Sequence, residues 1–350
     1  MKVAGWLGLA TFCVVGAGAY VAFVLNTPYA GFRQPVFVDL PRGTSTRQMA
    51  TLLRHSGVIR HFWAFLAARA VRPGARLEAG EYQFSRPASA LQVFDRIARG
   101  DVFYYELVVP EGKNMFDIAD EAQRLGLFPS ARFLKAAHDT ALIRDLDPRA
   151  PTLEGYLFPD TYRLSRHTTS EDLCRIMTRR FRQEWTKLET RAPVHRTVTL
   201  ASMVEKEGRI AEERPLIASV FLSRLALGMK LDCDPTTIYA ALLAGSYSGA
   251  IHRSDLSSDS PYNTYQHAGL PPGPIANPGL AAIKAVLDPA GAHYLYFVAR
   301  GDGSGSHVFS SSLAVHRANV LRYRRAIDHQ RRKASSKKYA NVKSAVPPVY

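Results

Sequence analysis

The chain has 350 residues, a formal net charge of +15, 47% hydrophobic and 21% charged residues, which describes a folded protein and excludes a disordered one. This length allows two domains and a sizeable core. Because the three cysteines form no Cys-x-x-Cys pair and no His/Cys cluster has metal-ligand spacing, we expect no metal. No cofactor is expected either. Cys174 and Cys233 could form at most one disulfide or remain buried thiols.

The first feature along the chain is an apolar run. Val3 to Leu25 comprises 23 residues without a charge, and as a helix it would span ~35 Å, enough for a ~30 Å hydrocarbon layer. Lys2 precedes it, which favours a cytoplasmic N-terminus. We therefore predict a transmembrane anchor over residues 1–29. The alternative is a cleaved signal peptide with Ala17-Gly18-Ala19 as its cleavage site, for which the run is long.

A strand–turn–helix pattern occurs twice, 69 residues apart. Val38 to Gly43 is followed by Met49-Ala50, and Leu107 to Gly112 is followed by Ile118-Ala119. Each copy predicts a short strand, a Pro-x-Gly turn and the start of a helix. An internal repeat and the chance recurrence of a common unit explain this pattern equally well.

The remaining periodicity predicts an α+β protein. A small α+β module is expected over residues 35–106, with helices over 63–70 and 88–98 and a strand over 80–84. A mostly helical domain with a small β element is expected over 107–328. Its predicted helices cover residues 114–125, 130–137, 171–189, 213–227, 238–243, 280–287 and 313–327, and its paired strands cover 294–299 and 307–310.

Two later stretches are predicted to lack regular structure. Residues 270–279 contain four prolines, so they can form neither a helix nor a central strand, and we expect this rigid loop to shape a surface. Residues 329–350 are predicted to be a flexible basic tail. Residues 321–350 hold nine Lys or Arg and one Asp, a net charge of 9 − 1 = +8, which suits an anionic lipid or polymer surface or simply a solvated tail.

The most informative stretch, Thr197 to Gly208, predicts a helix with an N-terminal cap and a glycine stop. At ~100° per residue, Glu207 lies ~20° from Leu200, inside the apolar stripe, whereas Glu205 lies ~140° away at its margin. Burial disfavours the charged carboxylate, so Glu207 is expected to hold its proton. A protonated carboxylic acid can cleave a glycosidic bond as a general acid; a solvated glutamate at a helix end is the alternative.

Aromatic and amide side chains accompany this acid. Tyr262, Asn263 and Tyr265 offer two rings and an amide within four residues, groups that stack on sugars and bind N-acetyl groups, although ordinary packing explains them too. Gly-x-Ser-x-Gly and phosphate-binding loop motifs are absent, and the glycine-rich turn Gly301 to Gly305 lacks nucleotide-binding spacing.

Six segments together resemble the MltG (YceG-like) family of endolytic peptidoglycan transglycosylases of the bacterial inner membrane. They are residues 200–207, 213–225, 234–236, 262–265, 269–279 and 294–299. The resemblance extends from residue 3 to about residue 325 and leaves the basic tail outside.

The resemblance implies that Glu207, the second glutamate of Glu-Lys-Glu, is the catalytic residue. It also implies that residues 35–106 form a LysM-like module, which would bind N-acetylglucosamine-containing glycans. The catalytic domain would be periplasmic and would act on nascent peptidoglycan strands beside the peptidoglycan synthases of the inner membrane, ending strand elongation. Nucleic acid is not an expected partner.

The implied reaction cleaves the β-1,4 bond between N-acetylmuramic acid and N-acetylglucosamine without water. Glu207 would protonate the glycosidic oxygen and then take the proton of the muramic acid 6-hydroxyl, which closes to a 1,6-anhydro end. One carboxyl acts twice, unlike the usual glycosidase pair. Candidate groove residues are Tyr262, Asn263 and Tyr265 with the loop 270–279, and more weakly Thr236 and His307.

Three other functions remain as alternatives. A lysozyme-like hydrolase would use water as the nucleophile and leave reducing ends. A non-catalytic glycan-binding scaffold would position synthesis enzymes. A pyridoxal-phosphate lyase would need a Schiff-base lysine in an α/β cofactor domain, whereas Lys206 lies on the polar side of its helix and the chain lacks alternating strands and helices.

Overall fold

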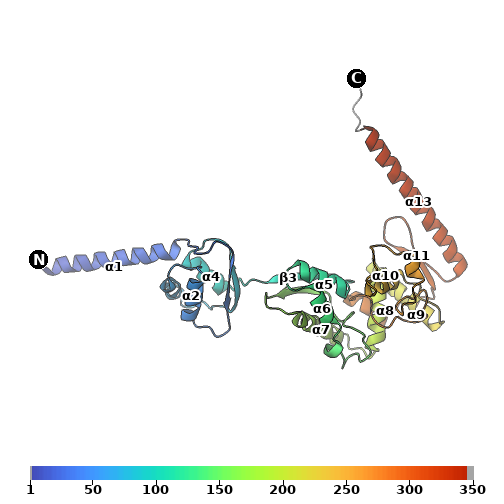
Figure 1. Cartoon of the computed structure of the whole chain (residues 1–350), viewed down its shortest axis with the longest axis horizontal. Coiled ribbons are helices and arrows are strands. Elements are labelled where there is room, and N and C mark those ends of the chain that lie inside the picture. Colours follow the sequence, from blue (N-terminus) through green and yellow to red (C-terminus); the bar gives the residue numbers. More distant parts are fainter. Residues whose placement is uncertain (1, 345–350) are drawn as a thin grey trace, which may run out of the picture. The chain divides into compact units, whose positions relative to one another are not determined.

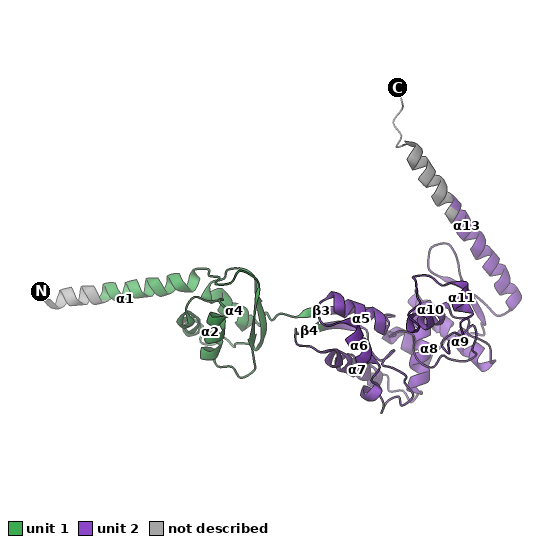
Figure 2. Cartoon of the chain, viewed as in Figure 1, with its two compact units in different colours: residues 1–106, 163–166 green, residues 107–162, 167–350 purple. Residues whose placement is uncertain are grey.

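The computed structural model describes the backbone of residues 2–344 and the side chains of residues 11–330 and of Arg332. The chain divides into two compact units, Met1–Glu106 with Arg163–Arg166, and Leu107–Tyr162 with His167–Tyr350 (Figure 2). Figure 1 labels their elements. Helices combine with three two-stranded sheets in the part of the chain described, which confirms the predicted α+β class.

Unit 1 is built around a two-stranded antiparallel sheet in which Val38 of β1 lies opposite Tyr82 of β2. Its core contains the fully buried side chains of Leu53, Phe65 and Phe94. The C-terminal end of the first helix joins this core through Leu25. The elements of unit 1 are α1 (Lys2–Asn26), β1 (Val36–Leu40), α2 (Thr46–His55), α3 (Phe62–Val71), β2 (Gly80–Phe84) and α4 (Ala90–Arg99).

The repeated sequence pattern corresponds to a repeated structure. β3 (Tyr105–Val109) and α5 (Met115–Arg124) follow β1 and α2 by 69 residues at both of their ends. Ser45 and Asn114 cap the two helices, each in a capping box with the third helical residue. Between strand and helix, Gly43 (φ +85°) and Gly112 (φ +77°) adopt the left-handed conformation that glycine allows. The two copies therefore share their strand, turn, cap and helix.

The strand β4 (Asp160–Leu164), which pairs with β3, was not predicted from the sequence. The other elements of unit 2 are α6 (Ser130–Ala137), α7 (Ser170–Lys187), α8 (Val194–Glu207), α9 (Arg214–Ala226), α10 (Asp234–Leu243), α11 (Arg253–Leu256), α12 (Leu280–Leu287), β5 (Tyr296–Ala299), β6 (His307–Ser310) and α13 (Leu313–Ser344), with one-turn helices at Thr140–Leu142 and Ala211–Glu213. β5 and β6 are antiparallel, as predicted.

Helix α8 lies at the centre of unit 2, packed against α9, α10 and α12. It begins at Val194, three residues before the predicted start, with Pro193 at the N-cap and no side-chain cap. It ends at Glu207, as predicted from Gly208. A Cβ at Gly208 would lie 2.8 Å from Cγ of Arg214 and 3.0 Å from the carbonyl oxygen of Val204, so only glycine fits there.

The proline-rich loop 270–279 is a core segment, and the expectation that it shapes a surface is wrong. Its residues from Gly273 to Gly279 are all buried. Asn277 Oδ1 accepts hydrogen bonds from the backbone N–H groups of Gly155 (2.8 Å) and Leu157 (3.0 Å). Asn277 Nδ2 donates to Glu154 Oε1 at 2.8 Å. A buried irregular loop needs such side-chain partners for backbone groups that no helix or sheet satisfies.

Helix α13 continues to Ser344, well beyond the predicted end at residue 327. Residues 328–344 contain neither proline nor glycine and are rich in lysine, arginine and alanine, which favour helix. Near its start, α13 packs on the β5–β6 hairpin, where Asn319 Nδ2 donates to Ser310 Oγ at 3.0 Å. Tail residues 345–350 lie outside the described residues.

The predicted anchor over residues 1–29 falls on α1, whose side chains before residue 11 lie outside the described residues. In the described part of the chain, no helix is long and apolar enough to cross a membrane.

Candidate functional site

A pocket of about 750 Å³ in unit 2 opens at the C-terminal end of α8. Three of the predicted site residues, Glu207, Tyr265 and His307, line it. The walls come from the loop before α10, the β5–β6 hairpin and α13, and include Arg224, Asp232, Asp234, Phe297, His316, Val320, Tyr323 and Arg324. The pocket therefore joins segments that lie far apart in the sequence around one carboxyl group.

Glu207, the last residue of α8, is partly exposed to this pocket. Burial raises the pKa of Glu207, and the negative charge of Asp234 raises it further, while the Cys233 hydrogen bond and His307 lower it. The partial negative charge at a helix C-terminus also disfavours a carboxylate there. Among the residues described, Glu207 has no ion-pair partner. These surroundings favour the protonated acid.

Glu205 has a different environment, although it lies only two residues away. Its side chain is 5% exposed, and Oε1 accepts from Arg214 Nη2 at 2.8 Å. Oε2 accepts from the backbone N–H of Gly279 at 3.1 Å. Glu205 therefore joins α8 to α9 and to the end of the proline-rich loop. It does not line the pocket, which separates its role from that of Glu207.

Tyr265 and His307 are held at the pocket by carboxylates. The Tyr265 hydroxyl donates to Asp234 Oδ1 at 2.6 Å, which leaves the ring to line the pocket. His307, the first residue of β6, has Nδ1 2.8 Å from Glu213 Oε2, and its backbone N–H donates to the same carboxylate. This contact ties the β5–β6 hairpin to the segment after α8.

Thr236, Tyr262 and Asn263 do not line the pocket. Thr236 and Asn263 are fully buried, so neither offers a surface to a glycan. Asn263 Nδ2 instead donates to carbonyl groups of the segment 255–258. Tyr262 packs on Tyr239 with ring centroids 5.1 Å apart. These three residues therefore pack outside the pocket lining, and two of them are buried.

The sequence prediction missed Cys233, Asp234, Arg224 and the residues of α13. Thr236 is the predicted groove residue of the segment 234–236, whereas Asp234 is the residue of that segment that lines the pocket. Cys174 and Cys233 are buried free thiols, which confirms the second of the two predicted alternatives, but no site role was predicted for Cys233. The sequence gives no signal for the α13 residues, because their approach to Glu207 depends on tertiary packing.

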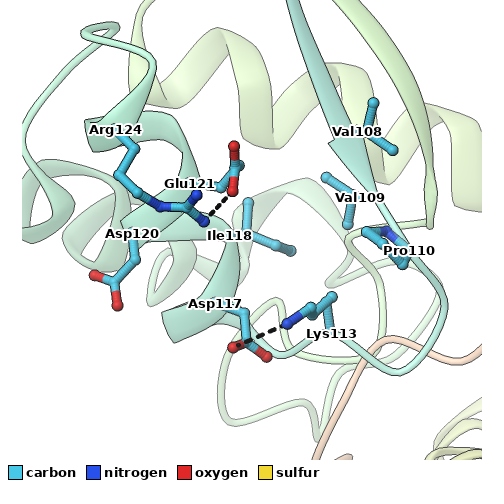
Figure 3. Close-up of a pocket in the computed structure, with 9 residues that line it drawn as sticks. All are labelled: Val108, Val109, Pro110, Lys113, Asp117, Ile118, Asp120, Glu121 and Arg124. Carbon is cyan, nitrogen blue, oxygen red and sulfur yellow. Dashed lines mark hydrogen bonds and ion pairs between the residues drawn. The ribbon is translucent and has the colours of Figure 1, made fainter.

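A second pocket, of about 400 Å³, lies between β3 and α5 (Figure 3). Four of its five charged side chains form pairs, Lys113 with Asp117 and Arg124 with Glu121, while the exposed Asp120 accepts a hydrogen bond from Ser130 Oγ. Exposed pairs of this kind contribute little energy, and this pocket lacks the buried, unpaired carboxyl found in the larger one. No group of three or more metal-ligating side chains occurs in the part of the chain described.

The pocket of the largely helical unit 2 thus presents a carboxyl of raised pKa with no ion-pair partner among the described residues, which is the arrangement of an enzyme that uses acid catalysis. Residues 38–322 match the YceG-like family, and the chain belongs to it.

Named relatives agree with this assignment. The chain is 30% identical over 331 residues to the endolytic murein transglycosylase of Bacillus subtilis (strain 168), covering 88% of this chain and 90% of the relative. It is 29% identical to the endolytic murein transglycosylase of Streptococcus pneumoniae (strain D39), covering 83% of this chain and 60% of that relative. The crystal structure of the YceG-like protein lmo1499 from Listeria monocytogenes matches with a TM-score of 0.54 and 31% identity, covering 82% of this chain and 99% of that one.

Proposed function

We propose that this chain is an endolytic peptidoglycan lytic transglycosylase, which cleaves the β-1,4 bond between N-acetylmuramic acid and N-acetylglucosamine and leaves a 1,6-anhydro end. The observation that carries the proposal is Glu207, a carboxyl of raised pKa that lines a large pocket. Membership of the YceG-like family and the names of its relatives support it.

In the proposed mechanism Glu207 acts first as acid and then as base. Its proton passes to the glycosidic oxygen as the bond to the anomeric carbon breaks. The carboxylate then takes the proton of the muramic acid 6-hydroxyl, whose oxygen bonds to the anomeric carbon. No water is consumed and Glu207 ends protonated, so the substrate supplies the nucleophile.

The other carboxylates of the pocket support a single catalytic acid. Asp232 pairs with Arg224 Nη1 at 3.0 Å, and Asp234 accepts the Tyr265 hydroxyl. A retaining glycosidase needs a second carboxylate free to attack carbon, and an inverting one needs a carboxylate free to activate water. With both aspartates engaged by partners, neither role is readily filled.

The glycan would lie along the pocket against the rings of Tyr265 and Phe297, which suit stacking on sugar faces. Tyr262, Asn263 and Thr236 would act indirectly, by fixing the shape of the wall behind Glu207. His307 would contact the strand beside the acid.

The proposal extends to location. We propose that α1 anchors the chain in the bacterial inner membrane, with unit 2 on the periplasmic side. The run of 23 uncharged residues supports this, as do the exposed apolar side chains of Phe12 (76%) and Val14 (71%). Unit 1 would be a LysM-like module that holds nascent strands near the synthases, so that cleavage ends their elongation. Deletion of residues 2–26 should then release the protein from membranes.

The products distinguish transglycosylation from its rivals. Purified glycan strands are digested with the chain lacking residues 2–26. The fragments should carry anhydro-muramic acid ends, which mass spectrometry distinguishes from reducing ends because they are lighter by one water. Reducing ends would support the hydrolase instead. An unchanged strand length with retained binding would support the non-catalytic scaffold and overturn the proposal.

A further inference from the structure

A buried thiol contacts the acid of the pocket. Sγ of Cys233 lies 3.4 Å from Oε1 of Glu207, a hydrogen-bond distance for sulfur. Cys233 is 1% exposed and occupies the N-cap of α10. Burial raises the pKa of the Cys233 thiol well above its ordinary value, so the group keeps its proton. The S–H group is therefore the donor and the carboxyl oxygen the acceptor.

Two threonines hold Cys233 in place. Its backbone N–H donates to Thr264 Oγ1 at 3.0 Å, and its carbonyl accepts from Thr236 Oγ1 at 2.7 Å. The two threonine hydroxyls lie 2.9 Å apart. All three residues are buried, so the thiol has little freedom to move. The segments 234–236 and 262–265, which the sequence marks as motifs, thus meet at the backbone of Cys233.

Charged and titratable groups reach the same region from every neighbouring element. Asp234 lies on α10, His307 on β6, Arg224 on α9, and His316 and Arg324 on α13. Within the described part of the chain, none of these five makes a hydrogen bond to Glu207. The thiol thus provides the side-chain contact that orients the carboxyl, whereas two of the charges act on the pKa of Glu207, Asp234 raising it and His307 lowering it.

We propose that Cys233 is a positioning residue for the catalytic acid, because its S–H group fixes Oε1 of Glu207 and leaves Oε2 to carry the transferred proton. Oε2 gives this proton to the glycosidic oxygen and later receives the proton of the 6-hydroxyl. The thiol is neither oxidised nor alkylated in this cycle. The inference rests on the proposed function, since it needs Glu207 to be the acid.

Replacement of the thiol with and without a donor tests the proposal. Cys233→Ala removes the donor, Cys233→Ser keeps one, and Cys174→Ala changes a buried free cysteine of α7 as the matched control. The readouts are kcat and the alkaline limb of kcat/KM, which reports the acid of the free enzyme. All proteins are compared per folded molecule.

Cys233→Ala should lower kcat about tenfold, the effect of losing one hydrogen bond to the reacting group. Its alkaline limb should move to higher pH, because the lost hydrogen bond stabilised the carboxylate. Cys233→Ser should restore kcat to within about threefold and return the limb to its native pH or below, as a hydroxyl is a better donor than a thiol. Cys174→Ala should leave both unchanged.

If the alkaline limb of kcat/KM in Cys233→Ala stays at its native pH, the inference is overturned. A merely structural role would change only the fraction of enzyme that is folded. Equal losses in the alanine and serine variants would overturn it as well. Glu207→Gln is measured beside them. If Glu207→Gln keeps the native rate, the proposed function itself fails; if it loses the rate while Cys233→Ala leaves the pH profile unchanged, only the inference about Cys233 fails.

Discussion

At the scale of single residues, the immediate surroundings of Glu207 favour its protonated form, although the pocket wall also carries Arg224 and Arg324. Burial is the largest influence on the pKa of Glu207, and Asp234 acts in the same direction. A general acid must hold its proton at the working pH and release it when the bond breaks. The pKa of Glu207 should therefore appear as the alkaline limit of activity.

Asp234→Asn tests this electrostatic account. Removing the negative charge lowers the pKa of Glu207, so the alkaline limb of kcat/KM should move to lower pH, while the amide oxygen still accepts the Tyr265 hydroxyl. Asp232→Asn is the matched control, because it removes a carboxylate of the same pocket whose charge is paired with Arg224, so a smaller shift is expected. A pH profile that Asp234→Asn leaves in place would contradict the account.

The sequence identified Glu207 for a reason that was only partly right. The helical angle placed Glu207 in the apolar stripe and Glu205 at its margin. In the structure α8 is enclosed on most sides, and Glu205 is the glutamate held in a buried ion pair. Glu207 differs in having no such partner among the described residues. Which of the two glutamates is paired depends on where Arg214 lies, and therefore on tertiary packing.

At the scale of elements, α13 contributes more to the site than its sequence indicates. His316, Val320, Tyr323 and Arg324 line the wall of the pocket that faces the end of α8. The Arg324 side chain is exposed, and no ion pair of Arg324 occurs among the described residues. Peptidoglycan strands carry carboxylates on their muramic acid and peptide groups, so a cation here would attract them.

Arg324→Ala should therefore raise KM about three- to tenfold at low salt and leave kcat nearly unchanged, as expected for the loss of one charged contact to a bound polymer. The effect should diminish as salt increases. Arg325→Ala, an exposed neighbour that does not line the pocket, is the control. Equal changes in the two variants would mean that α13 acts only through its overall charge.

Elements governed by local signals were predicted well, and those governed by tertiary contacts were not. The helices α6 and α12 match their predicted bounds, and the capped starts of α2 and α5 reproduce the repeat. The strand β4 was missed because it is short and takes its stability from pairing with β3. The buried state of loop 270–279 depends on Asn277, whose partners lie more than a hundred residues away.

At the scale of the whole molecule, the two units have separate interiors. The unit 1 core of Leu53, Phe65, Phe94 and their neighbours is formed by residues before 106. The pocket residues all belong to unit 2. We therefore expect that each unit can be altered without loss of the other's fold.

Phe65→Ala tests this independence. Removing a fully buried aromatic ring should destabilise unit 1 by about 3–5 kcal/mol. Calorimetry should show one unfolding transition moved to lower temperature, with the transition of unit 2 in place. Below both transitions, kcat on short soluble strands should stay native. A joint shift of all unfolding, or a matching loss of kcat, would mean that the units depend on each other.

The central claim is that Glu207 performs the chemistry and Glu205 supports the fold. Glu207→Gln and Glu205→Gln are compared in one experiment that measures the release of anhydro ends and the melting temperature at pH 8. A glutamate whose pKa is raised by folding contributes stability below its unfolded pKa and loses it as pH rises, so Glu207→Gln should not lower the melting temperature there.

Glu207→Gln should lower the rate ~10²–10⁴-fold. Burial raises the pKa of Glu205 as well, but Glu205→Gln leaves the mostly buried Arg214 guanidinium without its carboxylate partner, so it should lower the melting temperature by several degrees and keep the rate per folded molecule within about threefold. Release of anhydro ends at the native rate by Glu207→Gln, or its abolition in folded Glu205→Gln, would contradict the account.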